Sequence, residues 1–429
     1  MRSSTVLRQM QRKKAIIIGG GPAGIAAALY LRRRTPISCI VYELHPESTT
    51  LGGAIGIMPN GLRLLDRLGV HDKLLTKGNS CPSLILHSLQ GSTLGEINRV
   101  AAAKEETGFG YLRIKRSDLL DVLLEAAHND GIEIQYGKRL KSITNDANFV
   151  TIEFEDGTTD TADFLLGCDG IHSSVRRLYV DPDIHPEYTG VASLGSIIPA
   201  SLLEESAASQ LRGTHVTMTQ EGMFMAMPCD PSNEKILWGF QKEVPPPESG
   251  DDRNGWEVHR KMEVERFKSQ MLQVLRSARG EWGSAMKRII EQTSVVHFFP
   301  LYKLPLGGKW FRGRCLLLGD AAHAMPPHTG QGVSMALEDA SLLSRLLQND
   351  QRSLDDIYTT FDNIRRNRIR EIATQAEKNA ESRRRTGPLG LWLREKVTSW
   401  ALWGYAVLGK HSGSPDHKFS VYDIDKEEI

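Results

Sequence analysis

The chain has 429 residues, of which 40% are hydrophobic and 24% are charged, and this composition is typical of a soluble globular protein large enough for two packed domains. Its formal net charge of +1 argues against a general nucleic-acid-binding protein. The five cysteines are scattered and odd in number, so we expect reduced thiols in a cytoplasmic protein, with neither disulfides nor a bound metal.

The first binding signal follows a basic tail at residues 1–13. In AIIIGGGPAGIAAALYLRRR an apolar strand pattern meets a glycine turn and continues as a helix pattern. Gly19 forms the turn, Gly21 lets the backbone approach a pyrophosphate, and Gly24 lets the helix pack on the strand. A second strand, CIVYE, ends at Glu43, where a carboxylate can bind a ribose. A lone GxGxxG is weak evidence, but this context predicts a dinucleotide-binding domain.

The second motif is DFLLGCDGIHSSVRRLY, in which an expected strand ends in an acidic residue. Asp169 stands at the carboxyl end of this strand, where side chains of a doubly wound sheet face the ligand crevice. Arg176 is placed either to hold Asp169 or to bind the phosphates of a nicotinamide cofactor. Ser173 is a candidate N-cap of the following helix, and this structural interpretation is compatible with the functional one.

The segment CLLLGDAAHAMPPHTGQGVSMALED carries the third motif. Its strand delivers Gly319 and Asp320, and a proline-bounded loop delivers Gly330, Gln331 and Gly332 to a helix start. Such glycines allow close approach to a flat ring, the aspartate can accept hydrogen bonds from ligand hydroxyls, and the helix start stabilises an anion. The alternative is an ordinary loop in which Gly and Pro serve only the turns.

Beyond this motif the chain is helical and rich in arginine. The apolar stretch GPLGLWLREKVTSWALWGYAVLGK is interrupted by charges at 394–396, so we expect no membrane-spanning segment. We expect this helix to pack over the nucleotide-binding domain. Contact of Trp392, Trp400 and Trp403 with a membrane surface is the alternative.

With the three motifs in this order, residues 14 to about 375 closely resemble the class A flavoprotein monooxygenases. That family includes 4-hydroxybenzoate and salicylate hydroxylases, zeaxanthin epoxidase and many fungal secondary-metabolite oxygenases. GGAIGIMPNGLRLLDRLGV, RSDLLDVLLEAA and WFRGRCLLLGDAAH also match. The resemblance implies an α/β fold with a Rossmann-type FAD-binding domain (GR2-like), a β-sheet substrate domain and a C-terminal helical region. The implied boundaries are a tail at 1–13, an FAD-binding domain at 14–80, 101–185 and 305–375, a substrate domain at 81–100 and 186–304, and a helical region at 376–429.

The resemblance also implies tightly bound FAD, NADPH or NADH as a transient electron donor, and O₂. One oxygen atom would enter a hydrophobic ring-containing small molecule through a flavin C4a-hydroperoxide. Aromatic hydroxylation is the expected reaction, while alkene or indole epoxidation by the same intermediate and a flavin-dependent reductase or oxidase are the alternatives. A monomer and a dimer are both compatible with the sequence. The expected cofactor-binding residues are Gly19, Gly21, Gly24, Glu43, Gly53, Ala54, Arg116, Asp169, Arg176, Gly319, Asp320, Pro327, Gly330, Gln331 and Gly332.

The residues that would contact the substrate are less clearly indicated by sequence motifs. His328 is the candidate for activating a phenol, although it can equally be an ordinary loop residue. Tyr111 and Arg113 share one face of an expected strand and are candidates to orient a polar substrate. Exclusion of water requires an apolar pocket, although alternate residues on its strands must face away from the ligand. The expected pocket residues are Met223, Met225, Met227, Trp238, Phe240 and Phe299.

Overall fold

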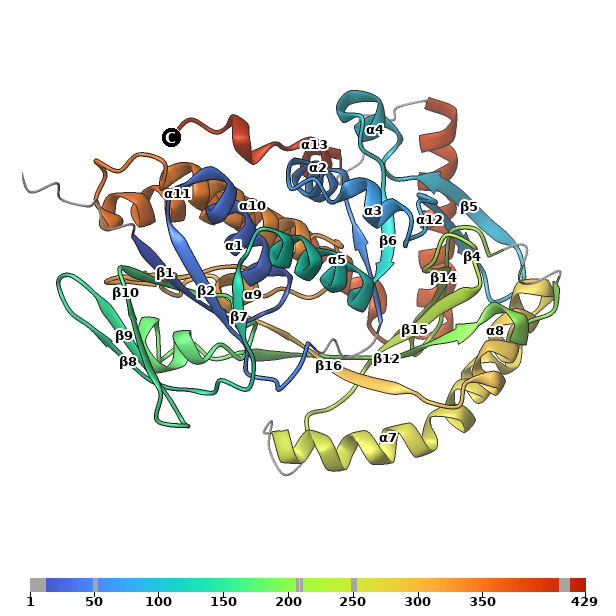
Figure 1. Ribbon diagram of the computed structural model, residues 1–429. Helices are drawn as coiled ribbons and strands as arrows, with labels where there is room; N and C mark the ends of the chain where they lie inside the picture. The colour runs from blue at the N-terminus through green and yellow to red at the C-terminus, as the bar shows by residue number, and fades with distance from the viewer. Residues whose placement is uncertain (1–12, 49–52, 206–207, 209–210, 248–252, 409–416) are drawn as a thin grey trace, which may run out of the picture.

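Two β-sheets organise the molecule (Figure 1). The computed structural model describes residues 13–429 except 49–52, 206–207, 209–210, 248–252 and 409–416, so nearly all of the predicted basic tail lies outside the described residues. The first sheet has the strand order β17-β18-β11-β1-β2-β7 and is parallel except for β17. Its strands are β1 (Lys14–Ile18), β2 (Ser38–Tyr42), β7 (Glu133–Gln135), β11 (Phe164–Gly167), β17 (Phe311–Arg312) and β18 (Cys315–Leu317).

The strands at the centre of this sheet are short apolar runs, because helices and other layers bury them on both faces. Residues 15–18 of β1 and all of β11 and β18 are buried. The helix α1 begins with proline at its first turn and ends with three arginines, both of which favour a helix at those positions. The helix α1 (Pro22–Arg34) packs on β2 of this sheet, and α5 (Arg116–Asn129) and α10 (Gly332–Leu346) pack against α1.

The second sheet has seven strands in the order β16-β12-β15-β14-β13-β4-β5. Two helices cover one of its faces, α7 (Arg253–Val274) and α8 (Gly280–Gln292), and Trp238 of β15 stacks there on Phe267 with ring centroids 5.4 Å apart. This sheet therefore has one face packed against helices. Its opposite face is free to meet the first domain, the part of the molecule built on the first sheet. The strands are β4 (Ser83–His87), β5 (Thr93–Asn98), β12 (Glu187–Pro199), β13 (Thr214–Met218), β14 (Gly222–Pro228), β15 (Lys235–Glu243) and β16 (His297–Lys303).

Smaller elements connect the two sheets. A two-stranded sheet pairs β3 (Ala54–Ile57) with β6 (Leu112–Lys115), and Asn79 beside it donates a hydrogen bond of 2.7 Å to Asn233, in the turn between β14 and β15. The remaining short elements are α2 (Pro59–Arg67), α3 (His71–Leu75), α4 (Ala101–Thr107), α9 (Asp320–His323) and a three-stranded sheet of β8 (Leu140–Asn145), β9 (Val150–Phe154) and β10 (Thr159–Ala162). The mixed α/β architecture with a Rossmann-type domain confirms the predicted fold class.

The C-terminal region does not form a unit of its own. The helix α11 (Leu354–Ala380) packs on α10 and runs without a break through the boundary predicted at residue 375. The helix α12 (Pro388–Leu408) then packs against β5, at the edge of the second sheet (Figure 1). Our prediction that this helix covers the nucleotide-binding domain was therefore wrong, and its tryptophans are exposed.

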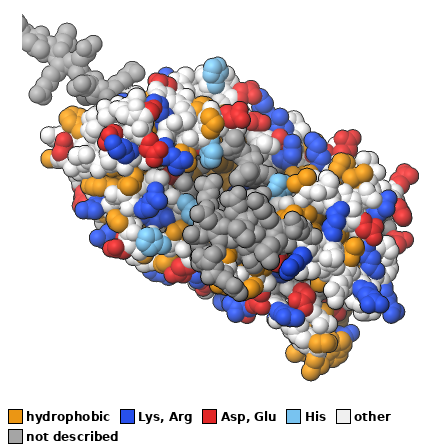
Figure 2. Space-filling model, turned by 90° about the horizontal axis from the view of Figure 1, so that it is seen from below, with side chains coloured by type: hydrophobic (Ala, Val, Ile, Leu, Met, Phe, Trp, Pro, Cys, Tyr) orange, Lys and Arg blue, Asp and Glu red, His pale blue; other side chains and the backbone are white. Residues whose placement is uncertain are grey.

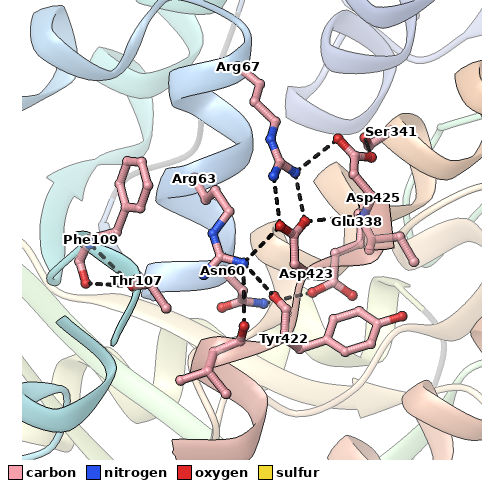
Figure 3. A network of polar contacts seen from close by, with 12 residues as sticks. Asn60, Arg63, Arg67, Thr107, Phe109, Glu338, Ser341, Tyr422, Asp423 and Asp425 are labelled. Atoms are coloured by element: carbon pink, nitrogen blue, oxygen red, sulfur yellow. Dashed lines mark hydrogen bonds and ion pairs between the residues drawn. The ribbon is translucent and has the colours of Figure 1, made fainter. Parts of the chain in front are cut away.

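The final segment returns to the first domain, where α13 (His417–Val421) and the residues after it lie on α2 and α10. Figure 3 shows two arginines of α2 pointing at Asp423. Arg67 and Arg63 approach its carboxylate to 2.7 and 3.2 Å, and Arg67 also reaches Asp425 at 2.9 Å. Burial raises the pKa of Asp423, but its ion pairs outweigh burial and lower that pKa to about 2. These ion pairs attach the chain end to the helices that frame the first domain.

The surface agrees with the small net charge of the sequence. Figure 2 shows acidic and basic side chains interspersed over one face of the molecule. Among the helices that the structure describes, none combines the length and the apolar character needed to cross a bilayer.

Candidate active site

The three motifs of the first domain meet in space although they are far apart in the sequence. A Cβ atom added to Gly19 would lie 2.4 Å from the carbonyl oxygen of Cys168, and one added to Gly319 would lie 3.4 Å from Cβ of Ala23. These contacts bring the ends of β1, β11 and β18 to one edge of the sheet. In an open parallel sheet, that carboxyl edge is where ligands bind.

The glycines at this edge fall into two groups. Gly19 and Gly24 are packed against protein, since a Cβ on Gly24 would lie 1.9 Å from the carbonyl oxygen of Gly19, which itself has a φ of +110°. Gly21, Gly330 and Gly332 face open space, because an added Cβ would meet no atom within 4 Å. The first group holds helix against strand, and the second leaves room for a bound molecule.

Two uncapped helix starts face the same region. Neither the N-cap of α1, Gly21, nor that of α10, Gln331, makes a side-chain capping hydrogen bond. The N–H groups of a first helical turn have no partner within the helix, so an anionic ligand is favoured there. A pyrophosphate suits the start of α1, and an electron-rich ring suits the start of α10.

At the far end of this edge, Glu43 follows β2 at the offset expected of a ribose ligand. Its Oε2 accepts a hydrogen bond of 2.7 Å from the Gly20 amide and its Oε1 accepts one of 2.9 Å from the His45 amide. These bonds fix the carboxylate beside the glycine turn. The contact joins the two parts of the predicted dinucleotide fingerprint.

Asp320 and Arg116 lie near each other at the site. Asp320 remains exposed to solvent, but the protein that crowds it raises the pKa of its carboxyl by desolvation, and the charges of His323 and Arg116 oppose that rise. The Arg116 amide donates to the carbonyl of Gly53 at 3.1 Å, and Ala54 pairs with Lys115 across β3 and β6. The predicted residues of three separate segments thus line one region, and Pro327 lies exposed in the loop that follows.

Several polar atoms near this region are buried without a hydrogen-bond partner in the described part of the chain. They are Oγ1 of Thr329, Oγ of Ser334, Nδ1 of His328 and Oδ1 of Asp169. Buried polar groups are normally hydrogen-bonded, so a cluster of unpaired ones indicates a missing partner. Together with the open glycines and helix starts, they fit a cofactor with polar edges such as FAD.

The second sheet presents its open face to the loop before α10 that carries Pro327 and His328. Met223, Met225 and Met227 alternate on β14, and Met223 pairs across the sheet with Gln241. Gln241 pairs with Ser193, which pairs in turn with Phe299, so all of these side chains share one face. Gln241 accepts a hydrogen bond of 2.5 Å from Nε of Arg383, which follows α11. This face therefore points toward the first domain.

Trp238 and Phe240 lie on the other face. They pair across the strands with Ala226 and Phe224, and both belong to the core beneath α7 and α8. The prediction that they line the substrate pocket was wrong, because the strand alternation turns them away from the loop. The four other predicted pocket residues remain candidates.

His328 lies between the two domains. It is only 6% exposed, and its carbonyl accepts a hydrogen bond of 3.1 Å from Asn379 of α11. Burial lowers the pKa of His328 to about 3, with a further contribution from the charge of Arg383. The imidazole is therefore neutral at physiological pH, which makes it a weak base and a good hydrogen-bonding group.

Tyr111 and Arg113 also meet, as their shared strand face predicted. Nη2 of Arg113 donates to the Tyr111 hydroxyl, and the guanidinium lies 5.4 Å from the centre of the ring. The Tyr111 hydroxyl covers Gly56, where a Cβ would approach it to 2.7 Å. The pair closes over the β3–β6 sheet and is partly exposed there.

Comparison with known proteins identifies the first domain. A family model described as "FAD binding domain" matches residues 12–376, most of the chain. The chain belongs to this family. The chain is also similar to 6-hydroxynicotinate 3-monooxygenase of Bordetella bronchiseptica, with 29% identity over 93% of this chain and 97% of that protein, and to its namesake from Pseudomonas fluorescens, with 31% identity over 79% and 83%.

Solved structures agree on the fold of this family member. HpxO of Klebsiella pneumoniae, determined with FAD and uric acid, superposes with a TM-score of 0.78 at 22% identity, over 93% of this chain and 96% of that one. The predicted resemblance to class A flavoprotein monooxygenases is confirmed, and so are FAD as cofactor and an enzymatic function.

In this family member, Arg176 differs from its predicted role. It is 3% exposed, and its guanidinium donates to the carbonyls of Ala321 at 2.8 Å and Ile184 at 3.3 Å, and also to that of Ile171. Such a group has little capacity left for the phosphates of a nicotinamide cofactor, one of the two binding roles that the sequence suggested for it. Arg176 instead connects the second motif to the third. Asp169 caps the following turn by accepting from the Ser174 amide at 2.6 Å.

A buried charge network behind Gly319 was not predicted. Asp339 accepts hydrogen bonds of 2.7 Å each from the Gly319 amide and from Nε of Arg365, and its Oδ2 lies 2.7 Å from Nε2 of His323. Burial raises the pKa of Asp339, but the charges of His323 and Arg365 and these hydrogen bonds outweigh burial and keep the pKa below its usual range. The network fixes the turn that presents Asp320.

A second buried contact holds the Gln331 turn. Nδ2 of Asn60 donates to Gln331 at 2.9 Å and to Glu338 at 2.8 Å. Glu338 pairs in turn with Arg365 at 2.6 Å. No local pattern links these residues, because they come from α2, α10 and α11. Of these residues, only Gln331 and Glu338 lie within the third sequence motif.

Proposed function

We propose that this enzyme hydroxylates a small aromatic or heteroaromatic ring that carries an acidic substituent, with NADPH or NADH as the electron donor. The half-buried guanidinium of Arg383, on the open face of the substrate sheet and beside His328, is the observation that carries the substrate class. Membership in the monooxygenase family supports the reaction type.

We assign FAD to the carboxyl edge of the first sheet. Gly21 and the start of α1 would hold its pyrophosphate and Glu43 its adenosine ribose. Asp320 and Arg116 would contact the ribityl chain and phosphates, and the turn from Gly330 to Gly332 would lie against the ring. When bound and reduced, FAD supplies the activation of O₂ that side chains alone cannot provide.

The protein residues then prepare the site in three ways. The uncapped start of α10 stabilises negative charge on the ring through its N–H groups and dipole. Met223, Met225, Met227 and Phe299 exclude water from the reacting face. The two networks around Asp339 and Asn60 hold the turns that carry Asp320 and Gln331.

Arg383 supports an acidic substituent because a half-buried guanidinium on this face favours a negatively charged ligand beside it. Burial lowers the pKa of Arg383 to about 10, with a contribution from the neighbouring charge of Arg99. Two guanidinium groups near one another in a partly buried site favour a bound carboxylate or phenolate, which offsets both charges. The relatives' names point to the same chemistry, since 6-hydroxynicotinate, 3-amino-4-hydroxybenzoate and salicylate are hydroxylated aromatic acids.

His328 would orient the ring. Its Nδ1 is buried without a partner in the described part of the chain, so it can form a hydrogen bond with a substrate hydroxyl. Its low pKa means that it holds this hydroxyl without becoming fully protonated at neutral pH. We therefore assign His328 to positioning and not to general-base catalysis, the role that the sequence first suggested.

The test measures NADPH and NADH oxidation, peroxide release and ¹⁸O incorporation with a panel of hydroxylated aromatic acids and their neutral amides. We expect ¹⁸O in the product of at least one acid, with the amide turned over at least about tenfold less efficiently. Arg383→Gln should raise KM for the acid and leave KM for the amide unchanged. Arg384→Gln is the matched control, because Arg384 is exposed and pairs only at 3.5 Å with Glu381.

Product without ¹⁸O would move the enzyme to the reductase or oxidase class. Equal turnover of acids and amides, with ¹⁸O in both products, would retain the hydroxylase and refute the acidic substituent. An Arg383→Gln variant with the KM values of the Arg384→Gln control would refute the assignment of Arg383.

A further inference from the structure

The helix α12 has an unusual orientation on the protein. Its inward face packs on β5, where Leu402 lies against Gly95 and the Ser399 hydroxyl donates to the carbonyl of Leu94 at 3.2 Å. Glu395 also faces inward and accepts a hydrogen bond of 3.0 Å from Ser88. The more polar face of the helix is thus the one turned toward the protein.

The outward face is apolar. Leu389, Trp392, Leu393, Val397, Trp400 and Trp403 are between 55% and 77% exposed. Their spacing of three, four and seven residues places them on one stripe along the helix. These six are nearly half of the large apolar side chains that are exposed in the described part of the chain. A stripe of this kind in water is unfavourable unless another surface covers it.

The charge that the helix itself exposes on the stripe is basic. Lys396 is exposed on the stripe itself. The exposed Arg384 and Arg385 precede the helix, each in a weak surface ion pair, with Glu381 at 3.5 Å and with Glu221 at 3.2 Å. The one carboxylate among residues 388–404 is that of Glu395, which faces inward. Cations at the edge of an apolar stripe attract a negatively charged surface.

The shape of the stripe favours a lipid surface over a second protein. A stable protein–protein interface buries about 800 Å² on each partner and uses roughly 20 to 30 residues per side. Here one helix offers six large apolar side chains that project from the protein. The helix has 21 residues and is therefore about 30 Å long, a suitable length for lying along a bilayer surface. Tryptophan is the residue most typical of the membrane–water interface.

We infer that α12 docks the enzyme on the surface of a membrane that contains anionic lipids. Trp392, Trp400 and Trp403 enter the boundary between headgroups and acyl chains, and Lys396 and the two arginines before the helix bind headgroups. The helix lies in the plane of the surface and does not cross it, in agreement with the absence of a spanning helix among those described. This inference is independent of the substrate proposed above.

The experiment mixes the FAD-loaded enzyme with vesicles of phosphatidylcholine alone, or with about 30% phosphatidylserine added, and measures the bound fraction by flotation. Tryptophan fluorescence is recorded in parallel. We expect binding to the anionic vesicles with a blue shift of the emission, and a partition coefficient at least about tenfold lower for a variant with serine in place of Trp392, Trp400 and Trp403. Lys396→Glu should weaken binding only to the anionic vesicles, because it changes charge and not apolar area.

A variant with Phe149→Ser and Val295→Ser is the matched control, since both side chains are exposed apolar residues outside α12. It should bind vesicles as the wild type does, and all variants should retain FAD. Wild-type enzyme that stays unbound with both vesicle types would overturn the inference. Equal binding by the triple tryptophan variant would also overturn it. So would a wild-type enzyme that binds no vesicles and sediments as a dimer, if the triple variant sediments as a monomer.

Discussion

Replacement of Asp339 by asparagine should destabilise the enzyme by several kilocalories per mole. The carboxylate is fully buried and contacts three groups at 2.7 Å, the Gly319 amide, His323 and Arg365. Asparagine has a similar shape, but it carries no charge and places an amide donor where at least one donor already points. Arg365, itself fully buried, would lose its ion pair with residue 339 and keep Glu338 and Met335 as partners.

Two estimates bracket the cost. Three charge-assisted hydrogen bonds at about 1.5 to 3 kcal/mol each would sum to more than about 4 kcal/mol. Removal of one partner from a buried ion pair costs about 3 to 5 kcal/mol. We expect the second range, because Glu338 still compensates Arg365 and asparagine retains one acceptor. The affinity for FAD should also fall at least about tenfold, equivalent to about 1.4 kcal/mol, because Gly319 positions Asp320.

The assay is urea-induced unfolding of the wild type and the variant. Their midpoints are compared provided that the dependence of the unfolding free energy on urea concentration has the same slope in both. The flavin-free proteins are also titrated with FAD. Glu377→Gln is the control, because its ion pair with Lys303, 2.8 Å long, lies at the surface and should contribute about 0 to 1 kcal/mol. An Asp339→Asn variant that unfolds at the same urea concentration as this control, and binds FAD like the wild type, would refute the reasoning.

Three further predictions concern the same molecule. Gly24→Ala should reduce FAD occupancy and stability, because its Cβ would lie 1.9 Å from the carbonyl oxygen of Gly19, and flavin absorbance per protein measures the loss. Asp320→Ala should weaken FAD binding by about 1.5 to 3 kcal/mol without unfolding the enzyme, and an unchanged dissociation constant would contradict its placement. Burial lowers the pKa of His87 to about 4 and that of His328 to about 3, so the unfolded chain binds more protons below about pH 6.5. Stability should therefore be fully present above that pH and fall from about pH 6.5 toward pH 4, with a shallower fall in a His87→Gln variant; a flat urea midpoint from pH 8 to 5 would exclude this contribution.

The sequence by itself determined the nucleotide-binding half of this enzyme. The glycine turn at Gly19, the carboxylate at Glu43 and the Gly319–Asp320 turn are local patterns, because each combines a strand end, a turn and a helix start within a short segment. Backbone conformation and helix dipoles are local properties, so adjacent residues suffice to predict them. The family resemblance followed from the order of these segments.

The tertiary structure decided which side chains face the substrate and which only support the site. Trp238 and Met227 belong to neighbouring strands of similar composition, yet one lies in the core beneath α7 and the other on the open face, because strand register fixes the direction of each side chain. Asp339 and Arg365 are 26 residues apart, and Gln241 and Arg383 are 142 apart, so no local pattern could pair them. The exposed face of α12 was also beyond the sequence, because an apolar helix stripe has the same spacing whether it covers a core or faces outward.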